Sequence, residues 1–453
     1  MKSMESIAAE LAAYDPQALS ADTVSSFLAR LVEPVTQHEE VGIFQALGRV
    51  LATDVISPIS VPPHDNSAMD GYAFDGTALA AASPLTLKVV GTALAGKAWS
   101  GQVQHGECVR IMTGAVMPQG LDTVVPQELV SHGPDQNPQT EYITLAPGTV
   151  RPGDNRRHLG EDLLQGQPAL QKGALLTPAA LGLMASLGIE RLQVWRQLRV
   201  AYFSTGDEIL SLGEPPREGA VYDSNRYTVF GLLTRLGCEV IDLGVVRDEP
   251  TLLEAAFTHA ASVADAIITS GGVSVGEADY TKAMMKKLGD VAFWKIAMRP
   301  GRPMAVGRII KEKLASSPHE ISAISYSNNS NSEPSNDAIL FGLPGNPVAV
   351  MVTFLVFVRP ALLQMMGSTA AAPPLLKARS SEAIRKKPGR TEYQRGVVST
   401  TPEGTLQVKA TGNQGSGVLS SMVQANGLIV LHHNQGNVVE GDELDVMMFE
   451  GVV

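Results

Sequence analysis

Apolar and polar positions divide the chain into stretches with different periodicities. Over residues 1–50 the apolar positions recur at helical spacing, which predicts helices within 23–34 and 43–54. From 51 to 150 the pattern changes to short apolar runs, such as 85–91, that are separated by Gly and Pro. Runs of this kind are typical of strands, so the sequence predicts a small β domain in this part of the chain.

A further helix is predicted over residues 181–189. Thr177 is placed as its N-cap, and Pro178 suits the first helical position. Helical segments then lie on both sides of the β segment. This arrangement predicts one discontinuous helical domain into which the small β domain is inserted.

Strand and helix patterns alternate from residue 190 onward. Such alternation predicts a parallel sheet with right-handed crossovers and helices on both faces. Ligands gather at the carboxyl ends of the strands in sheets of this type. The expected strands cover 198–203, 239–246, 265–272, 304–309 and 338–343, and the expected helices cover 226–237, 251–263 and 279–289.

The most apolar run of the chain, 348–358, ends at Arg359 and Pro360. It is shorter than the roughly 20 residues that span a bilayer, so we expect a buried core helix and no membrane partner. The segment 312–338 predicts a mobile loop, because its Ser/Asn-rich second half, 327–336, cannot bury enough apolar area to order itself; recruitment of a partner is the alternative.

These patterns together predict a multidomain α/β protein. Its largest part is a three-layer α/β domain with a parallel-rich sheet. A discontinuous helical linker domain, the inserted β domain and a C-terminal β domain built from short strands complete the chain. The expected boundaries are 1–55 with 150–188, 56–149, 189–370 and 371–453.

Composition narrows the class of protein. The chain is 44% hydrophobic and 18% charged with a formal net charge of -11, which is typical of a soluble globular protein and argues against a nucleic-acid binder. The acidic N-terminus lacks the features of a secretory signal, which favours a cytoplasmic location. Cys108 and Cys238 are too few for a disulfide framework, and the His residues show no zinc spacing.

The stretch GGVSVGEADY, residues 271–280, follows an expected strand. Gly271, Gly272 and Gly276 allow backbone N–H groups to approach a ligand, and a helix that begins near Asp279 adds its positive end. This combination predicts an anion site that suits phosphate, although the spacing of a Walker or dinucleotide loop is missing. A simple tight turn with Asp279 as helix cap is the alternative.

Two other loops have the same character. In 341–350, Gly345 and Asn346 expose the backbone directly before a helix that starts at Pro347. In 204–208, polar and acidic residues follow the end of a strand. Three such loops at one sheet edge favour a ligand site over turn chemistry alone.

Charged side chains accompany these loops. Several carboxylates are expected on the same rim of the sheet. Neighbouring carboxylates resist joint ionisation unless a cation offsets their charge, and hard oxygen ligands suit Mg²⁺. Separate helix caps and solvated loop charges are the alternative. Arg299 and Arg302 flank a turn and could clamp an oxyanion or phosphate. The carboxylates expected on the rim are Asp207, Glu208, Asp248, Glu277 and Asp279.

A dense polar segment, 61–74, lies ahead of the β domain and reads VPPHDNSAMDGYAF. With RIMTGAVMP, GEDL, FSTGDEI, YDSNRY, TSGGVSVGEADYTK, MRPGRP and GLPGNPVAV, which follow in this order, the chain closely resembles the molybdopterin molybdenumtransferase family. This family comprises bacterial MoeA and is related to the E domain of gephyrin. The motifs span roughly residues 30–365.

The resemblance implies an elongated four-domain subunit in a homodimer, and a pterin-binding role for the α/β domain. It further implies insertion of molybdate into adenylylated molybdopterin with Mg²⁺, giving molybdenum cofactor and AMP. Molybdopterin adenylyltransferase and maturation factors of molybdoenzymes are the implied partners. Asp70 and Thr113 would reach the site from the N-terminal part, across the dimer interface. The implied catalytic residues are Asp70, Thr113, Asp162, Glu208, Asp248 and Asp279, of which Glu208, Asp248 and Asp279 would hold the metal.

The substrate-binding candidates come from the strand-end loops and from the arginine turn. They are Ser204, Thr205, Gly206, Asp207, Gly271, Gly272, Ser274, Gly276, Arg299, Pro300, Gly301, Arg302, Pro344, Gly345, Asn346 and Pro347.

The sequence leaves several alternatives for the activity, the oxyanion and the residue roles open. Arg302 and Ala349 stand where the family commonly has Lys and Ser, and Arg differs from Lys in its planar fork of donors. Adenylylation of molybdopterin is a rival activity, and a scaffold or pterin carrier is a rival without turnover. The motifs do not choose between molybdate and tungstate, and they do not assign the catalytic base.

Overall fold

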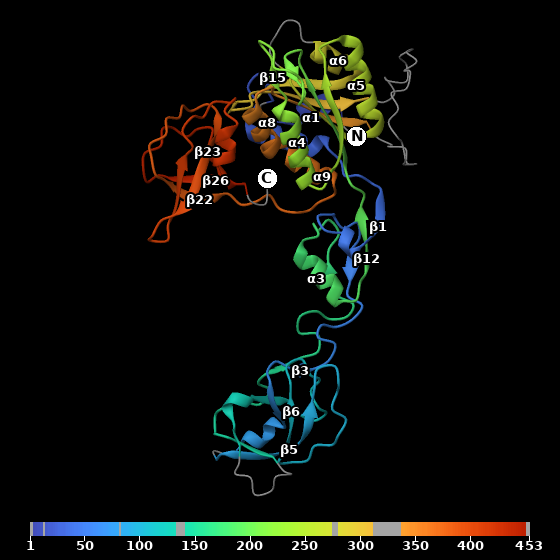
Figure 1. The fold of residues 1–453 in the computed structure, drawn as a ribbon, viewed down its shortest axis with the longest axis vertical. Coiled ribbons are helices and arrows are strands. Elements are labelled where there is room, and N and C mark those ends of the chain that lie inside the picture. Colours follow the sequence, from blue (N-terminus) through green and yellow to red (C-terminus); the bar gives the residue numbers. More distant parts are fainter. Residues whose placement is uncertain are drawn as a thin grey trace.

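The computed structural model describes residues 3–11, 14–80, 83–132, 141–273, 280–310 and 337–449. The chain is elongated (Figure 1). An α/β body and a C-terminal β-barrel lie side by side at one end, the inserted β domain lies at the other, and a slender linker region joins them.

A six-stranded sheet forms the centre of the α/β body. Its order is β16-β13-β17-β21-β20-β18, and the first four strands are parallel whereas β20 and β18 are antiparallel to their neighbours. The expected parallel-rich sheet is confirmed, but β18 was not among the expected strands. The strands are β13 (Arg199–Thr205), β16 (Glu239–Val246), β17 (Ala266–Ser270), β18 (Gly289–Lys295), β20 (Pro303–Ile309) and β21 (Ala338–Leu343).

Helices cover both faces of this sheet, as the three-layer prediction requires. In β13, Val200 and Tyr202 face a core that contains α4 (Ser224–Arg235), whereas Ala201 and Phe203 face a second core that contains α5 (Pro250–Val263) and α6 (Tyr280–Leu288). Both faces of the strand are therefore buried, because successive side chains of a strand point to opposite sides.

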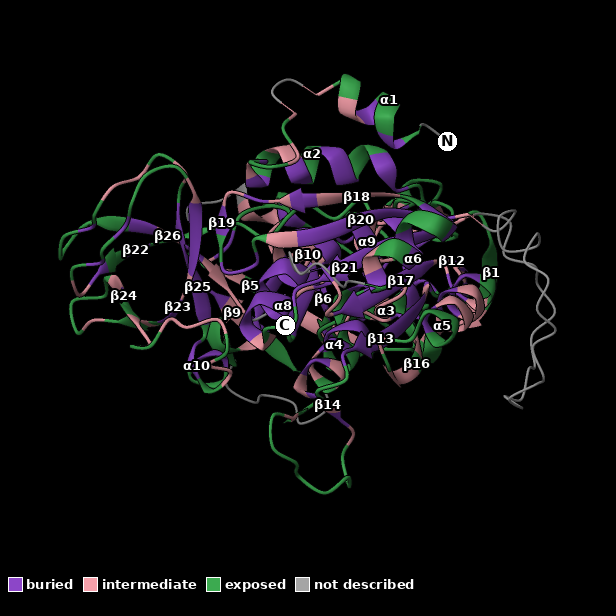
Figure 2. Cartoon of the chain, turned by 90° about the horizontal axis from the view of Figure 1, so that it is seen from above, coloured by how far each residue is buried: buried purple, intermediate pink, exposed green. Residues whose placement is uncertain are grey.

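The N-terminal helices pack against the α/β body. Helices α1 (Met4–Ala9) and α2 (Ala21–Leu31) bury apolar residues in the same core as α4. The rings of Phe27 and Trp294 meet edge to face at 4.9 Å, and Arg308 donates a hydrogen bond of 2.8 Å to the Leu31 carbonyl. Figure 2 shows α2 lying along one side of the sheet, next to β18.

The prediction of a helix within 43–54 is wrong. The structure has only a short 3₁₀ turn, Ile43–Gln45, and Gly48 then adopts a positive φ of 74°. Val50 and Leu51 form bridges with Leu175 and Val194 instead. Tertiary pairing with these distant segments satisfies the apolar side chains that suggested a helix.

The linker region has a small core of its own, to which Leu51 and Met184 belong. Helix α3 (Pro178–Ser186) begins as expected, because the Thr177 side chain accepts a hydrogen bond from the Ala180 N–H. The ladder of β1 (His38–Gly42) with β12 (Arg191–Trp195) connects the linker to the α/β body. Short pairs complete the region, formed by β2 (Val55–Ile56) with β11 (Pro168–Leu170) and by β3 (Asn66–Ser67) with β10 (Arg156–Arg157).

The inserted domain is a six-stranded sheet of order β7-β4-β6-β5-β9-β8, as the β-like runs predict. Its strands and 3₁₀ turns are β4 (Gly71–Phe74), η2 (Gly76–Ala80), β5 (Leu85–Ala93), β6 (Glu107–Ile111), β7 (Thr123–Pro126), η3 (Gln127–Leu129), β8 (Ser131–His132) and β9 (Tyr142–Leu145).

The C-terminal strands close into a barrel. β23 pairs with both β24 and β25, β25 pairs with β26, and β22 joins β26 to β24. The elements are β22 (Leu376–Ser380), β23 (Thr391–Thr400), β24 (Leu406–Ala410), α10 (Ser420–Gln424), β25 (Gly427–Leu431) and β26 (Glu443–Met448), with β19 (Met298–Arg299) added to β23 from the α/β body.

The apolar run at 348–358 is a buried helix, but it does not end at Arg359 and Pro360. α8 (Pro347–Thr353) passes through the π-helical η4 (Phe354–Val358) into α9 (Arg359–Met365). A π turn shifts the backbone hydrogen-bond pattern, so a proline that lacks an N–H can follow without ending the helix. The helix is long and apolar enough to cross a membrane, but 67% of its most apolar window is buried inside the protein, as in a core helix.

The domain boundaries expected from the sequence remain predictions. The expected loop at 312–338 falls almost wholly outside the described residues.

Candidate active site

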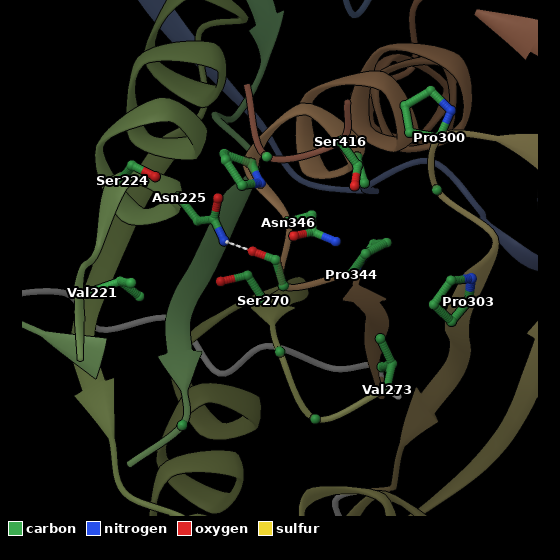
Figure 3. A pocket seen from close by; sticks show the side chains of 18 of the residues that line it. Val221, Ser224, Asn225, Ser270, Val273, Pro300, Pro303, Pro344, Asn346 and Ser416 are labelled. Carbon is green, nitrogen blue, oxygen red and sulfur yellow. Dashed lines mark hydrogen bonds between the residues drawn. The ribbon is translucent and has the colours of Figure 1, made fainter. Parts of the chain in front are cut away.

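A cavity of about 940 Å³ opens where β13, β17 and β21 end. Figure 3 shows side chains from α4, the start of α8 and the barrel around it. The carboxyl ends of parallel strands meet at this edge, which explains why motifs far apart in the sequence converge here. The predicted residues that line the cavity are Thr205, Gly206, Glu208, Asp248, Gly271, Gly272, Arg299, Pro300, Gly301, Arg302, Pro344, Gly345, Asn346 and Pro347.

Other predicted residues are placed differently. Ser204 is buried beneath the cavity, and Asp207 accepts a hydrogen bond of 3.3 Å from the Asp248 N–H without lining it. Ser274, Gly276, Glu277 and Asp279 lie outside the described residues.

The first two glycines of the GGVSVGEADY loop allow a close approach between chain segments. Gly271 has a φ of 92°, and a Cβ atom there would lie 2.4 Å from the Thr205 carbonyl oxygen. Gly272 has a φ of 65°, and its Cβ atom would lie 2.5 Å from the Thr281 side chain. Only glycine fits both the backbone conformation and the space.

Hydroxyl groups form a buried network below the cavity. The Tyr202 hydroxyl lies 2.8 Å from the Ser204 hydroxyl and 2.7 Å from that of Ser270, and the two serine hydroxyls lie 3.1 Å apart. Burial raises the pKa of Tyr202 well above its ordinary value, so the phenol stays neutral. The network ties the ends of β13 and β17 together.

Two of the predicted metal ligands, Glu208 and Asp248, line the cavity. The Thr281 hydroxyl donates a hydrogen bond of 3.3 Å to the Asp248 carboxylate. Within the described part of the chain no group of three or more His, Cys, Asp or Glu residues is placed to hold a metal. The third predicted ligand, Asp279, falls in the gap at 274–279, so the three-residue metal site stays a prediction.

Three arginines also line the cavity. Arg299 and Arg302 belong to the predicted turn, and Arg390 comes from the barrel. The Arg390 guanidinium contacts the Glu392 carboxylate at 2.7 and 2.8 Å, and only 4% of the Glu392 side chain is exposed. A buried carboxylate of this kind fixes the direction of the guanidinium.

Sequence reasoning missed the contribution of the barrel. Arg390, Gln414, Ser416 and Gly417 line the cavity, and no motif in the sequence marked them as site residues. The Val348 N–H in the first turn of α8 donates a hydrogen bond of 3.1 Å to the Ser416 carbonyl. This bond docks the barrel loop against the α/β body.

A buried arginine holds that loop. Arg395 is 1% exposed, and its guanidinium donates to the carbonyls of Asn413 (3.2 Å) and Gly415 (3.0 Å) and to the Ser421 hydroxyl (2.9 Å). The Gln414 side chain in turn bonds to the backbone N–H and carbonyl of Arg395. Burial, with a smaller effect of Arg299, lowers the pKa of Arg395 to about 10, so it remains a cation near neutral pH.

The YDSNRY motif, which sequence reasoning did not assign to the site, lines the cavity as well. Tyr222, Asp223, Ser224 and Asn225 all lie on it. The Asn225 side chain donates a hydrogen bond of 2.8 Å to the Gly345 carbonyl, which Figure 3 shows as a dashed line. The start of α4 is thereby tied to the loop that precedes α8.

Asp70, Thr113 and Asp162 are not brought to this cavity within one chain. The backbone N–H and hydroxyl of Thr113 each donate to the Asp70 carboxylate at 2.7 Å, which lowers the pKa of Asp70. This pair lies in the inserted β domain, at the far end of the molecule from the α/β body (Figure 1). Asp162 lies in the linker region, where its N–H donates to the Val61 carbonyl at 3.1 Å.

The loop that carries Asp70 is held in place by Asp65. The Asp65 carboxylate accepts from the Leu159 N–H at 2.7 Å and from Arg156 Nε at 2.9 Å, and chiefly the Leu159 bond lowers its pKa. Segment 61–67 is therefore joined to segment 155–162.

Family models match almost the whole chain. Residues 19–188 match the "MoeA N-terminal region (domain I and II)", residues 201–364 match the "Probable molybdopterin binding domain", and residues 377–449 match the "MoeA C-terminal region (domain IV)".

Individual relatives agree with these matches. A molybdopterin molybdenumtransferase of Haemophilus influenzae is 41% identical over 94% of this chain and 97% of its own. One of a Nostoc species is 34% identical over 96% and 94%. A crystal structure of a molybdopterin biosynthesis MoeA protein from Pyrococcus horikoshii superposes with a TM-score of 0.74 at 25% identity, over 95% of this chain and 100% of that one. The chain therefore belongs to the molybdopterin molybdenumtransferase family, a family of transferases that act in molybdenum cofactor biosynthesis.

Proposed function

We propose that the chain inserts molybdate into adenylylated molybdopterin, in a reaction that requires Mg²⁺ and releases AMP. The observation that supports this proposal most is one cavity that carries both carboxylates, Glu208 and Asp248, and arginines, Arg299, Arg302 and Arg390. A substrate with a phosphoanhydride and an incoming oxyanion needs both kinds of group.

The proposed reaction couples cleavage of the phosphoanhydride to insertion of molybdate at the dithiolene. Water adds to the adenylyl phosphorus, the bond from that phosphorus to the oxygen of the molybdopterin phosphate breaks, and AMP leaves. At the dithiolene, molybdate forms two Mo–S bonds while two thiol protons and one molybdate oxygen leave as water. No electrons are exchanged in either part.

The carboxylates fit a role in holding Mg²⁺. Magnesium is commonly bound by one or two protein carboxylates together with substrate phosphates, so Glu208 and Asp248 supply a suitable donor set, and Asp279 is the proposed third member. When bound, the ion would polarise the phosphoanhydride. The Thr281 hydroxyl keeps the Asp248 carboxylate oriented at 3.3 Å.

The arginines fit a role in binding anions. A guanidinium presents several donors in a plane that matches tetrahedral oxyanions and phosphates. Arg390 is held for this purpose by buried Glu392. Arg299 and Arg302 would meet molybdate from the turn at 299–302, where Arg299 pairs with Glu392 of the barrel strand β23.

We further propose that the active unit is a cytoplasmic homodimer in which the inserted domain of one chain completes the cavity of the other. The Asp70–Thr113 pair is ordered by two bonds of 2.7 Å, yet lies far from the cavity of its own chain. A molybdopterin adenylyltransferase would supply the substrate, and maturation factors of molybdoenzymes would receive the product.

The test is AMP release by the purified protein from adenylylated molybdopterin with Mg²⁺, with and without molybdate. We expect release that depends on molybdate and that Glu208→Gln abolishes, while Glu214→Gln, which changes an exposed residue that does not line the cavity, releases AMP normally.

Other results would contradict the proposal. Bound substrate without AMP under either condition would make the chain a carrier or scaffold. Consumption of ATP and molybdopterin would indicate the rival adenylylation.

A further inference from the structure

The turn at 296–302, which we name the arginine turn, is fixed at its base. The Ile296 N–H donates a hydrogen bond of 2.7 Å to the Arg302 carbonyl, and this bond closes the turn. From the barrel, the Thr391 N–H donates to the Ala297 carbonyl at 2.9 Å. Most of the turn lines the cavity. The distance between the tip of the turn and α8 therefore helps to set the width of the cavity.

The tip of the arginine turn lies directly against α8. Gly301 has a φ of 96°, and a Cβ atom there would overlap the Thr353 hydroxyl and would lie 3.4 Å from Met298 Cε and 3.6 Å from the Ala349 carbonyl oxygen. We name Met298, Ala349 and Thr353 the seat of the turn; they are 3%, 2% and 0% exposed. Because Gly301 has no side chain, its backbone packs on the seat, and a change in the size of the seat moves the turn.

The Thr353 hydroxyl is the part of the seat closest to Gly301. It is closed to solvent and has no hydrogen-bond partner among the described residues, so it does not bond to the carbonyl of Ala349, four residues earlier, as threonines within helices often do. A buried hydroxyl without a partner destabilises a fold. Thr353 therefore acts here through its contact with the turn and not through a hydrogen bond.

We infer that Thr353 is a positioning residue, whose side chain holds the arginine turn at a depth that suits a large tetrahedral oxyanion such as molybdate; the inference rests on the proposed function. Guanidinium groups bind oxyanions through donors in a fixed plane. The depth of the turn then selects among anions of equal charge and different size. Sulfate is a suitable comparison, because it is tetrahedral and doubly charged like molybdate but smaller.

The test measures binding of molybdate and of sulfate to the full chain. Equilibrium dialysis gives the affinity for each anion, and AMP release gives kcat and the KM for molybdate. We expect the wild type to prefer molybdate to sulfate by about 10-fold or more, since a site of fixed size discriminates against a ligand that does not fill it.

Thr353→Ala removes the hydroxyl and the methyl group on which Gly301 rests. We expect the KM for molybdate to rise about 10-fold with kcat changed by less than about 2-fold, because the variant misplaces an anion-binding turn and leaves the carboxylates in place. The preference for molybdate over sulfate should fall by about 3-fold or more. Thr353→Ser keeps an oxygen against the turn and should retain most of the wild-type preference.

Val352→Ala is the matched control. It deletes as many non-hydrogen atoms as Thr353→Ala, from the next residue of α8, and the Val352 side chain is fully buried in the main core and is not among the nearest contacts of Gly301. It should lower the thermal stability at least as much as Thr353→Ala does, but leave both affinities unchanged. Thermal unfolding shows whether each variant folds.

Four results would overturn the inference. The wild type could bind molybdate no better than sulfate, or folded Thr353→Ala could keep the wild-type KM and preference. Val352→Ala could shift the preference equally, which would assign the effect to the stability of α8. Thr353→Ser could lose as much as Thr353→Ala, which would show that an oxygen at this position does not hold the turn.

AMP release separates this inference from the proposed function. Wild type that releases AMP with molybdate, together with an unchanged preference in Thr353→Ala, overturns only the role of Thr353. Wild type that releases no AMP overturns the proposed function, whereas a reduced preference of Thr353→Ala in dialysis would still support the seat.

Discussion

The cavity in the α/β body and the Asp70–Thr113 pair in the inserted domain are two predicted parts of one site, and the chain builds them in different ways. The cavity unites loops from 204 to 417 at one edge of a sheet. The Asp70–Thr113 pair is held by two bonds of 2.7 Å and belongs to the inserted domain, which lies at the other end of the molecule. Sheet topology brings the first part together within one chain, whereas the second would reach such a cavity only in the proposed homodimer.

The largest expected effect belongs to the cavity. Asp248→Asn removes a carboxylate that lines it, and we expect AMP release to fall by about 100-fold or more if the side chain holds the metal. Glu254→Gln, which alters an exposed ion pair with Lys287 on α5 and α6, should keep normal activity. Equal losses in both variants would show that the assay reports stability and not the site.

The next effect tests whether the two parts cooperate across chains. Asp70→Ala and Asp248→Ala should each be inactive alone. When equal amounts are mixed and allowed to reassociate, about a quarter of the sites should regain both residues, because half of the dimers are mixed and each has one intact site. AMP release measures the recovery. No recovery in mixtures shown to contain mixed dimers would place both residues in the same chain's site, or leave Asp70 without a role.

A smaller effect is expected from the residue that positions the barrel loop. Arg395→Met removes the three bonds that hold 413–421, and we expect the KM for molybdate to rise about 10-fold with a smaller change in kcat. Arg395→Lys, which keeps the charge but not the fork, should recover part of the loss.

Lys386→Met is the matched control for Arg395. Lys386 is a buried cation of the same barrel that bonds to the carbonyls of Lys387 and Gln435. If its replacement raises the KM equally, the effect of Arg395→Met reflects barrel stability. An unchanged KM in Arg395→Met would remove the positioning role.

The smallest effect concerns Asp65, which ties the loop of Asp70 to the linker region. Its pKa is lowered in the folded chain, so its stabilisation is complete above the ordinary Asp value of about 4 and is lost as the pH falls through the lowered value. Because the side chain is 28% exposed, solvent reduces the effect.

Hydrogen exchange of the Leu159 amide measures how strongly the Asp65 carboxylate holds this loop. In the wild type exchange should quicken as the pH falls through that range, after correction for intrinsic rates, whereas Asp65→Asn should exchange faster already at neutral pH. Asp75→Asn, an exposed carboxylate that bonds to Thr77, should leave Leu159 unaffected. Slow exchange in Asp65→Asn would show that Arg156 and the backbone hold the loop without the carboxylate.

Local patterns predicted the elements of the α/β body well. Alternation of strands and helices predicted the sheet and both of its helical layers, because each strand buries both faces and each helix carries a periodic apolar side. Failures came where distant segments decide the structure. Val50 and Leu51 suggested a helix, but they pair with Leu175 and Val194.

The residues of the cavity likewise divide into those that local motifs predicted and those that only contacts between distant segments bring there. The strand-end motifs identified Glu208, Asp248 and the glycines, since a strand that stops at Gly or Pro marks the binding edge of such a sheet. Nothing local marked Arg390 or Ser416, which reach the cavity only because the barrel docks beside α8.

The sequence by itself determined the α/β class, the strand-end loops and the family, because these depend on residue types at short spacing. Only the tertiary structure decided which core the N-terminal helices join, that the C-terminal strands close into a barrel, and that this barrel forms one side of the cavity. Such contacts join residues hundreds of positions apart. Their free energy comes from shape and burial across domains, and no short stretch of sequence carries that information.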